Sequence, residues 1–174
     1  MGILKKWNKV HNLTSVREDR EIIRRHFLDS LSLVKCFKDL NIPIKDKIIA
    51  DVGSGAGFPG VPLKIYYGDD IELILIESSA KKCAFLEYLK IHIGEDYEVV
   101  CERAENVSIK VDIAVARALG DLEYTEELLS KIGRGYIFIM KGREVEEVVK
   151  ERFNIYRINM NYLPPLNILW RKLS

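Results

Sequence analysis

A glycine-rich stretch at residues 51–62, with the sequence DVGSGAGFPGVP, is the part of the chain best suited to hold a ligand. It directly follows the apolar run KIIA, which predicts a short buried strand, and it precedes residues that predict a helix. Glycine has no Cβ atom, so the backbone can turn sharply and approach a ligand closely. A glycine-rich turn between a strand and a helix therefore indicates a nucleotide site.

Two motifs overlap in this stretch and imply different chemistry. Gly55, Gly57 and Gly60 fit G-x-G-x-x-G, which is typical of dinucleotide sites and hydride transfer. Asp51, Gly53, Gly55 and Gly57 fit acid-x-G-x-G-x-G, which is typical of S-adenosylmethionine sites. In either case, the N–H groups at the start of the following helix are expected to be available for a phosphate or a carboxylate.

The second motif fits the chain better. The dinucleotide motif begins only at the middle glycine and places Pro59 before its third glycine, where helix and strand must pack closely. The chain also lacks a second domain to hold a hydride substrate. Gly60 is then explained as the first residue of the helix, and its place in the dinucleotide motif as a coincidence. A merely structural turn is the remaining alternative.

Three further strand ends carry residues that suit a nucleotide. Glu77 follows the apolar run IELILI and is placed to accept the hydroxyl groups of a ribose, although a surface acid is the alternative. Ala104 and Glu105 follow YEVVCE; a small residue and an acid suit the edge of an adenine, but the signal is weak alone. Arg117 directly follows VDIAVA and must pair with an acid of the protein, a ligand carboxylate or an RNA phosphate, because a lone buried charge is costly.

Strand and helix patterns alternate along the chain, which predicts an α/β fold with a doubly wound sheet. The last two strands follow one another without a helix and are expected to form an antiparallel hairpin. We expect one domain, 1–174, with an N-terminal helical extension at 1–46 and an α/β core at 47–174. Helices are expected at 3–12, 18–38, 60–68, 79–93, 121–133 and 144–151, and strands at 47–52, 71–77, 97–102, 111–118, 135–142, 153–160 and 166–173.

The composition is that of a globular protein of 174 residues with 48% hydrophobic and 30% charged residues. No apolar run approaches the roughly 18 residues that span a bilayer, and we expect a cytoplasmic protein without membrane contact. The net charge of +1 conceals two basic ends, with seven Lys/Arg against three acids in 1–26 and nine against four in 131–174. If these ends lie on one face, they would attract a phosphate backbone; solvated helix faces are the alternative.

The cysteines, Cys36, Cys83 and Cys101, show no spacing typical of a zinc site or a disulfide framework. We therefore expect buried, reduced thiols. The chain also shows no Ser–His–Asp triad, carboxylate pair or metal-ligand cluster, and no metal is expected.

Several segments together resemble the RsmG/GidB family of bacterial methyltransferases, which modify N7 of a guanine in 16S ribosomal RNA. They are WNKVHNLTSVREDREIIRRHFLDSL, IIADVGSGAGFPGVPLKI, ESSAKKCAFLEYL, VARAL and MKG. The pairing of N-L-T-x-V with R-H-x-L-D-S-L ahead of the glycine loop is specific. The resemblance implies a class I S-adenosylmethionine-dependent methyltransferase fold: a Rossmann-like, seven-stranded, mostly parallel sheet with a reversed last strand, preceded by N-terminal helices.

The resemblance assigns cofactor contacts at Gly53, Phe58, Glu77, Ala104, Glu105 and Arg117. Combined with the glycine motif, the expected S-adenosylmethionine site consists of Asp51, Gly53, Gly55, Gly57, Phe58, Glu77, Ser78, Ala104, Glu105 and Arg117. The implied partner is 16S rRNA or a small-subunit particle, and we expect a monomer. The alternatives are a non-catalytic RNA-binding or ribosome-assembly module on this fold and, less favoured, a nucleotide-dependent oxidoreductase.

Methylation at guanine N7 requires no acid–base residue, because N7 has an exposed lone pair and the sulfonium methyl leaves without protonation. The enzyme's task is alignment of the reactants. Arg25 and Asp29 also have the spacing of a helical ion pair, and His26 is equally consistent with a core histidine. Candidates for the substrate side are Asn12, Arg25, His26, Asp29, Lys141 and Arg143.

Overall fold

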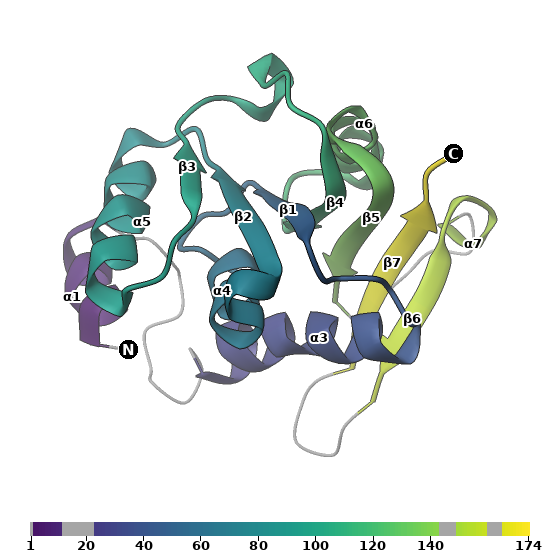
Figure 1. Cartoon of the computed structure of the whole chain (residues 1–174), viewed down its shortest axis with the longest axis horizontal. Coiled ribbons are helices and arrows are strands. Elements are labelled where there is room, and N and C mark those ends of the chain that lie inside the picture. The colour runs from purple at the N-terminus through teal and green to yellow at the C-terminus, as the bar shows by residue number, and fades with distance from the viewer. Residues whose placement is uncertain (1, 12–22, 143–148, 160–164) are drawn as a thin grey trace.

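A seven-stranded sheet, in the order β3-β2-β1-β4-β5-β7-β6, forms the centre of the computed structural model, which describes residues 2–11, 23–142, 149–159 and 165–174 (Figure 1). β1 to β5 run parallel to one another, whereas β7 is antiparallel to both β5 and β6. The predicted mostly parallel sheet with a reversed last strand is confirmed. The strands are β1 Lys47–Val52, β2 Ile71–Ile76, β3 Glu98–Val100, β4 Val111–Arg117, β5 Gly133–Lys141, β6 Asn154–Ile158 and β7 Leu166–Lys172.

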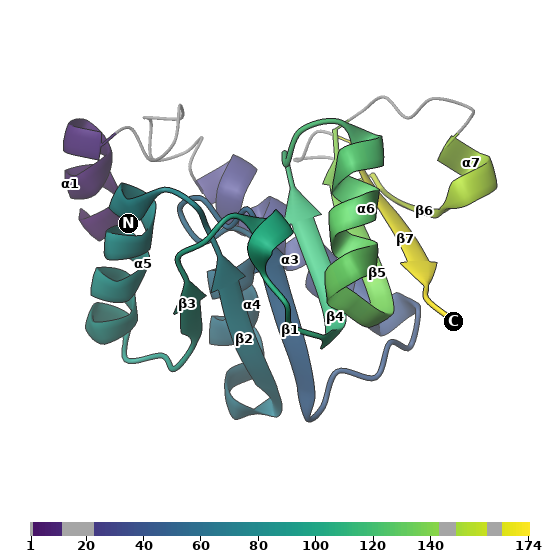
Figure 2. The same cartoon turned by 90° about the horizontal axis from the view of Figure 1, so that it is seen from above.

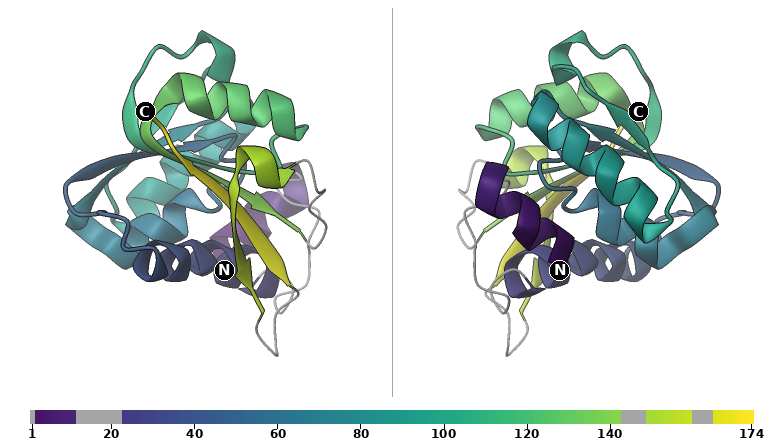
Figure 3. Two further views of the ribbon diagram at one scale, coloured as in Figure 1. Left: turned by 90° about the vertical axis from the view of Figure 1, so that its right-hand side faces the viewer. Right: turned by 90° about the vertical axis from the view of Figure 1, so that its left-hand side faces the viewer.

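Helices cover both faces of the sheet, and Figure 3 shows α3 beneath one face and α6 above the other. α3, α4 and α5 pack on the first face, and α6 and α7 on the second. The helical elements are α1 Gly2–His11, η1 Ile23–Leu28, α3 Asp29–Asp39, α4 Gly60–Tyr67, η2 Gly68–Asp70, α5 Ala80–Ile93, η3 Ala104–Asn106, α6 Leu122–Ile132 and α7 Val149–Arg152.

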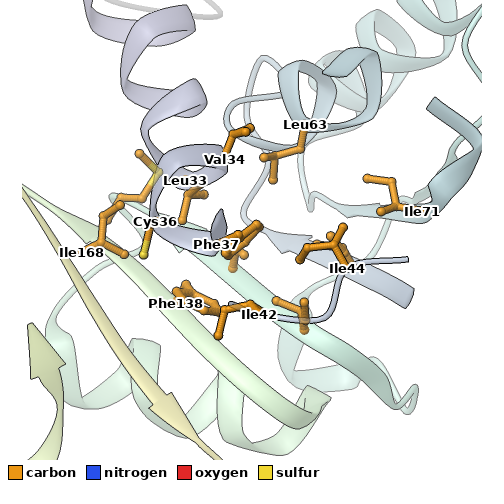
Figure 4. Close-up of a cluster of buried hydrophobic side chains, with 14 of the residues drawn as sticks. Leu33, Val34, Cys36, Phe37, Ile42, Ile44, Leu63, Ile71, Phe138 and Ile168 are labelled. Atoms are coloured by element: carbon orange, nitrogen blue, oxygen red, sulfur yellow. The ribbon is translucent and has the colours of Figure 1, made fainter. Parts of the chain in front are cut away.

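α3 is fixed on the sheet by the apolar cluster shown in Figure 4. The Phe37 ring of α3 meets the Phe138 ring of β5 edge to face, with centroids 4.8 Å apart, and both side chains are buried. Aromatic pairs in this geometry stabilise a core beyond their area of contact. The packing holds the first residue of α3, Asp29, near Arg117 at the end of β4.

The helix expected at 18–38 is described from residue 23 and has two parts, a π-helical segment η1 and then α3. The hydroxyl of Ser30 donates to the carbonyl of His26, and that of Ser32 donates to the carbonyl of Leu28 at 3.1 Å. Side-chain bonds of this kind compete with the backbone ladder of the helix. β3 is shorter than the strand expected at 97–102. Of the helix expected at 144–151, residues 149–151 lie in α7, and residues 144–148 lie outside the described part of the chain.

The expectation of three reduced cysteines is wrong, because Cys83 and Cys101 form a disulfide with Cα atoms 5.8 Å apart. Cys83 lies on α5 and Cys101 directly follows β3, so the crossover from β2 through α5 to β3 brings the two side chains together. Spacing along the chain carries no signal for such a pair. Cys36 is free and buried as expected, and burial raises the pKa of its thiol to about 12.

Reduction of this disulfide is expected to lower the free energy of unfolding by about 3 kcal/mol, the loop-entropy value for a closed loop of this length. Urea unfolding with and without a phosphine reductant measures the difference. Cys101→Ser, which cannot form the bond, serves as the control and should not respond to reductant. Equal stability of the oxidised and reduced wild-type protein would contradict the prediction.

Two described elements of the basic ends, α1 and β6, lie toward opposite edges of the sheet. α1 packs beside α5 near the β3 edge, and β6 forms the other edge. Figure 2 shows α1 and α7 flanking the side toward which the parallel strands point. No helix in the described parts of the chain is long and apolar enough to cross a membrane.

Candidate cofactor and substrate site

The glycine loop between β1 and α4 adopts the backbone conformations that glycine allows. Gly53, Gly55 and Gly57 have φ angles of +74°, +58° and +88°. A Cβ atom on Gly53 would lie 2.4 Å from Cδ1 of Leu119, whereas one on Gly55 would meet nothing closer than 4.0 Å. Gly53 is therefore required by packing inside the protein, and Gly55 leaves open space where a ligand can approach the backbone.

Two carboxylates at neighbouring strand ends occupy N–H groups of this loop. Oε2 of Glu77, just after β2, accepts from the Gly55 N–H at 2.8 Å. Oδ2 of Asp51, in β1, accepts from the Gly60 N–H at 2.8 Å. The N–H groups of Gly57 and Phe58 donate to the carbonyl of Ser54 at 2.8 and 3.2 Å. The expectation that the start of α4 offers free N–H groups to a phosphate or a carboxylate of a ligand is thus wrong at Gly60, since the carboxylate of Asp51 already binds that group.

Asp51 and Glu77 give the site a negative character. Asp51 is fully buried, and its Oδ1 atom has no hydrogen-bond partner among the described residues. Burial raises the pKa of Asp51 to about 7, against the opposing effects of the Gly60 N–H group and Arg117. Glu77 is 7% exposed and also accepts from the Ser79 N–H at 2.9 Å. A buried carboxylate oxygen without a partner is costly, and it fits a ligand that brings a cationic or hydrogen-bonding group.

Gly60 has a role that the sequence interpretation missed. A Cβ atom at this position would lie 2.5 Å from Cδ2 of Leu75 and 2.8 Å from Oδ2 of Asp51. Only glycine lets α4 start this close to β1 and β2. The place of Gly60 in the G-x-G-x-x-G motif is therefore not a coincidence, because the third glycine of dinucleotide sites serves the same close packing of helix and strand.

Arg117 is the centre of a compact cluster at the end of β4. Its Nη2 group donates to Nδ1 of His26 at 2.6 Å, and its Cζ atom lies 5.7 Å from the centroid of the Phe58 ring. The His26 and Phe58 rings stack with centroids 4.8 Å apart and planes 17° apart. Burial lowers the pKa of Arg117, while the carboxylates of Asp29 and Asp51 raise it. The structure thus brings together five residues that the sequence analysis named: Arg117, His26, Phe58, Asp29 and Asp51.

Ala104 and Glu105, the residues expected beside the adenine, follow β3 at the edge of the sheet formed by the carboxyl ends of the parallel strands. Ala104 and Glu105 form η3, and the exposed carboxylate of Glu105 accepts from the hydroxyl of Tyr124 at 2.7 Å. That hydrogen bond lowers the pKa of Glu105. The Lys131 ammonium donates to the backbone carbonyl of Glu105. Ser78 is exposed in the loop between Glu77 and α5.

Two residues of this edge were missed by sequence reasoning. Leu119 follows Arg117 in the loop after β4 and contacts the Gly53 position. The sequence feature that could have identified it is an apolar residue between Arg117 and Gly120, in a short loop at the end of a predicted central strand. Tyr124 lies in the first turn of α6, and nothing in the sequence pattern distinguishes it from an ordinary surface tyrosine.

Of the remaining substrate-side candidates, Lys141 lies within the described residues, whereas the others do so only in part or not at all. Lys141 is half-buried at the end of β5, opposite Asn167 of β7. The Asn167 amide donates to the carbonyl of Gly142 at 2.9 Å and so holds the backbone after Lys141. Arg25 lies within η1, but its side chain is outside the described part of the chain, as are the whole of Asn12 and Arg143. The expected Arg25–Asp29 pair therefore remains a prediction.

Within the described residues, no group of three or more His, Cys, Asp or Glu side chains is arranged to hold a metal ion.

Comparison with solved structures identifies the fold. A magnesium protoporphyrin IX methyltransferase from Synechocystis, solved with bound S-adenosylmethionine, superposes with a TM-score of 0.71 over 99% of this chain and 96% of that one, at 11% identity. A SAM-dependent methyltransferase from Aquifex aeolicus gives a TM-score of 0.65 over 97% of both chains, at 15% identity. The fold is the class I S-adenosylmethionine-dependent methyltransferase fold that the resemblance implied.

Sequence comparison identifies the family. A ribosomal RNA small subunit methyltransferase G from Aquifex aeolicus is 52% identical over 170 residues, covering 98% of this chain and 86% of that protein. A second, from Caldanaerobacter subterraneus, is 43% identical over 156 residues, covering 84% of this chain and 63% of that protein. The model of the GidB family, described as rRNA small subunit methyltransferase G, matches residues 1–162. The chain belongs to the GidB family.

Proposed function

We infer that this protein transfers a methyl group from S-adenosylmethionine to N7 of a guanine in 16S ribosomal RNA. Family membership supports the reaction, and one structural observation supports the cofactor. The glycine loop binds the carboxylates of Asp51 and Glu77 through its own N–H groups. A dinucleotide pyrophosphate would have to displace those carboxylates and would face their negative charge. A sulfonium nucleoside with a free amino group is instead attracted to them.

The residues present fit this cofactor. Glu77 would hold the ribose hydroxyls, Gly55 would let the cofactor approach the loop backbone, and Oδ1 of Asp51 would gain a partner from the ammonium group. Arg117 would hold the carboxylate of the methionine part, and Ala104 with Glu105 would border the adenine. When bound, S-adenosylmethionine supplies an electrophilic methyl group on a positively charged sulfur.

The chain's own contribution to the reaction is alignment. Guanine N7 attacks through a lone pair that needs no prior deprotonation, so no general base has to lie beside it. Orientation of two reactants can supply roughly 7–11 kcal/mol of the barrier in favourable cases. Asp29, at the start of α3, lies near Arg117 at the strand ends, and we expect it to border the target base.

The decisive experiment is a methylation map. The purified protein, S-adenosylmethionine and either deproteinised 16S rRNA or small-subunit particles are incubated, and N7-methylguanosine is located by borohydride and aniline cleavage. We expect one new cleavage site. Absence of methylation on both substrates, with tight RNA binding retained, would instead favour the non-catalytic RNA-binding module. We further propose that the protein acts as a monomer in the cytoplasm, which sedimentation at working concentration tests for the oligomeric state.

Two basic side chains beyond the cofactor site are expected to contact RNA phosphates. Lys141 and Arg157 lie directly opposite Asn167 on its two sides, so all three point to the same face of the sheet. Among the described residues, no acidic side chain forms an ion pair with either. Lys141→Gln and Arg157→Gln should each weaken RNA binding and reduce the slope of log K against log salt by about one.

Filter binding of 16S rRNA from low to moderate salt measures these slopes. Lys45→Gln, at an exposed lysine before the start of β1, is the matched control and should leave the slope unchanged. Equal slopes for all three variants would remove Lys141 and Arg157 from the RNA surface.

A further inference from the structure

We propose that His26 is a positioning residue for Arg117: its ring nitrogen holds the guanidinium at the cofactor loop and thereby joins the N-terminal segment to the cofactor site. The inference rests on the proposed function, because it assumes that Arg117 binds an anionic group of the cofactor. It assigns His26 a role distinct from an RNA contact and from a passive core histidine.

The contact defines the state of the imidazole. A guanidinium is always protonated and carries only donors, so Arg117 must donate in its 2.6 Å contact with Nδ1 of His26. Nδ1 therefore carries the lone pair, and the ring proton sits on Nε2. His26 is neutral in this arrangement, since an imidazolium has no acceptor to offer.

The orientation of the ring is fixed by neighbours from the cofactor loop and η1. The imidazole stacks on Phe58, which is only 7% exposed. The Phe27 ring meets the same Phe58 ring nearly at right angles, with centroids 5.0 Å apart. The backbone of His26 is also held, because its carbonyl accepts from the Ser30 hydroxyl. An acceptor held from several directions can fix the guanidinium that it binds.

A neutral acceptor suits this position better than an acid would. Arg117 already lies in the field of two carboxylates, Asp29 at the start of α3 and Asp51 in β1. A third carboxylate in direct contact would neutralise the guanidinium and compete with an anionic ligand. Histidine orients one N–H group and leaves the positive charge of Arg117 in place. The charge then remains available to the carboxylate of the cofactor.

The contact also couples two parts of the chain that are 91 positions apart. His26 belongs to η1, in the segment whose motif R-H-x-L-D-S-L precedes the cofactor domain, while Arg117 ends the central strand β4. Removal of the Nδ1 acceptor of His26 should therefore weaken cofactor binding, even though His26 itself need not touch the cofactor.

Three substitutions at His26 separate the acceptor from the ring. His26→Asn places an amide oxygen near the position of Nδ1, His26→Gln places its amide near the position of Nε2, and His26→Phe keeps a flat ring without an acceptor. By calorimetry with S-adenosylhomocysteine, we expect the Asn variant to bind within about threefold of the wild type. The Gln and Phe variants should bind about tenfold more weakly, the usual effect of losing one hydrogen bond to a charged group.

A double-mutant cycle keeps the test valid if a variant is destabilised. Arg117→Met removes the guanidinium while retaining a long side chain; combined with His26→Gln, it should bind no more weakly than Arg117→Met alone. Additive losses would overturn the inference, as would equal affinity of all three His26 variants or an Asn variant as weak as Phe. Failure of the wild-type protein itself to bind S-adenosylhomocysteine would instead refute the proposed cofactor, and with it this role of His26.

Discussion

Gly55→Ala is expected to weaken the binding of S-adenosylhomocysteine at least tenfold, or by about 1.4 kcal/mol, while costing the fold only about 1 kcal/mol. The added methyl group meets no protein atom closer than 4.0 Å, so the substitution creates no clash within the protein. Its structural cost comes from the φ angle of +58°, which is mildly unfavourable for alanine. The methyl group instead occupies the space through which the cofactor would approach the loop.

Gly94→Ala is a matched control for this substitution. Gly94 ends α5 in the left-handed region, at a φ of +69°, and a Cβ atom there also meets nothing within 4 Å. Both variants should lose similar stability in urea unfolding, but only Gly55→Ala should lose cofactor affinity in calorimetry. Gly53→Val is a poorer probe, because its side chain would collide with Leu119 and disturb the fold as well. Equal affinities of the two alanine variants would show that the cofactor does not pass over Gly55.

The fold was predictable because its determinants are local. Apolar runs such as IELILI and GYIFIMK predict buried strands, and each has a helix pattern between it and the next. The absence of a helix between the last two strands leaves only a hairpin, and β7 indeed lies antiparallel to β6. These statements depend on neighbouring residues alone, so they hold without knowledge of the tertiary contacts.

For the candidate site, the sequence predicted which residues lie at strand ends, but not their hydrogen-bond partners. Sequence placed Glu77 and Arg117 at strand ends, yet it could not show that Glu77 binds the Gly55 N–H or that Arg117 binds His26. These partners lie 22 and 91 positions apart, and their meeting depends on the order β2-β1-β4 within the sheet. The disulfide and the packing role of Gly60 escaped for the same reason. The residue types at the strand ends predict at which edge of the sheet a ligand binds. The hydrogen-bond partners of those residues depend on how the strands are ordered in the folded sheet.

The free energy of unfolding of the wild-type protein should fall as pH rises because of Asp51, and Asp51→Asn should abolish this fall. Burial lifts the pKa of Asp51 from the ordinary 3.8 to about 7 in the folded protein. A carboxyl group whose pKa is raised on folding favours the folded state at low pH, and this contribution is lost as pH rises through the folded value. The wild-type free energy of unfolding should therefore fall between about pH 4 and pH 7, by up to roughly 4 kcal/mol from this group.

Asparagine does not titrate, so the free-energy difference between variant and wild type should grow by roughly 2–4 kcal/mol in favour of the variant between pH 4 and pH 8. The asparagine of the variant would place an amide N–H group where Oδ1 of Asp51 lacks a partner. The cost of this change does not depend on pH, so it cancels when the free-energy differences at the two pH values are compared. Urea unfolding at both pH values measures it, and Asp70→Asn, at an exposed carboxylate, should show no such change. A difference independent of pH would mean that Asp51 is ionised in the folded protein throughout.

The same carboxylate links stability to ligand binding. S-adenosylmethionine carries a sulfonium and an ammonium group against one carboxylate, so it favours the ionised form of Asp51. Wild-type affinity should therefore rise with pH up to about 7 and binding should release a proton below that pH, while the Asp51→Asn variant should bind more weakly and without this dependence. Calorimetry in two buffers of different ionisation enthalpy counts the proton. Ionised Asp51 lowers the free energy of unfolding of the cofactor-free protein at neutral pH. The positive groups of the cofactor would offset this cost, which explains why the chain has a buried acid at this position.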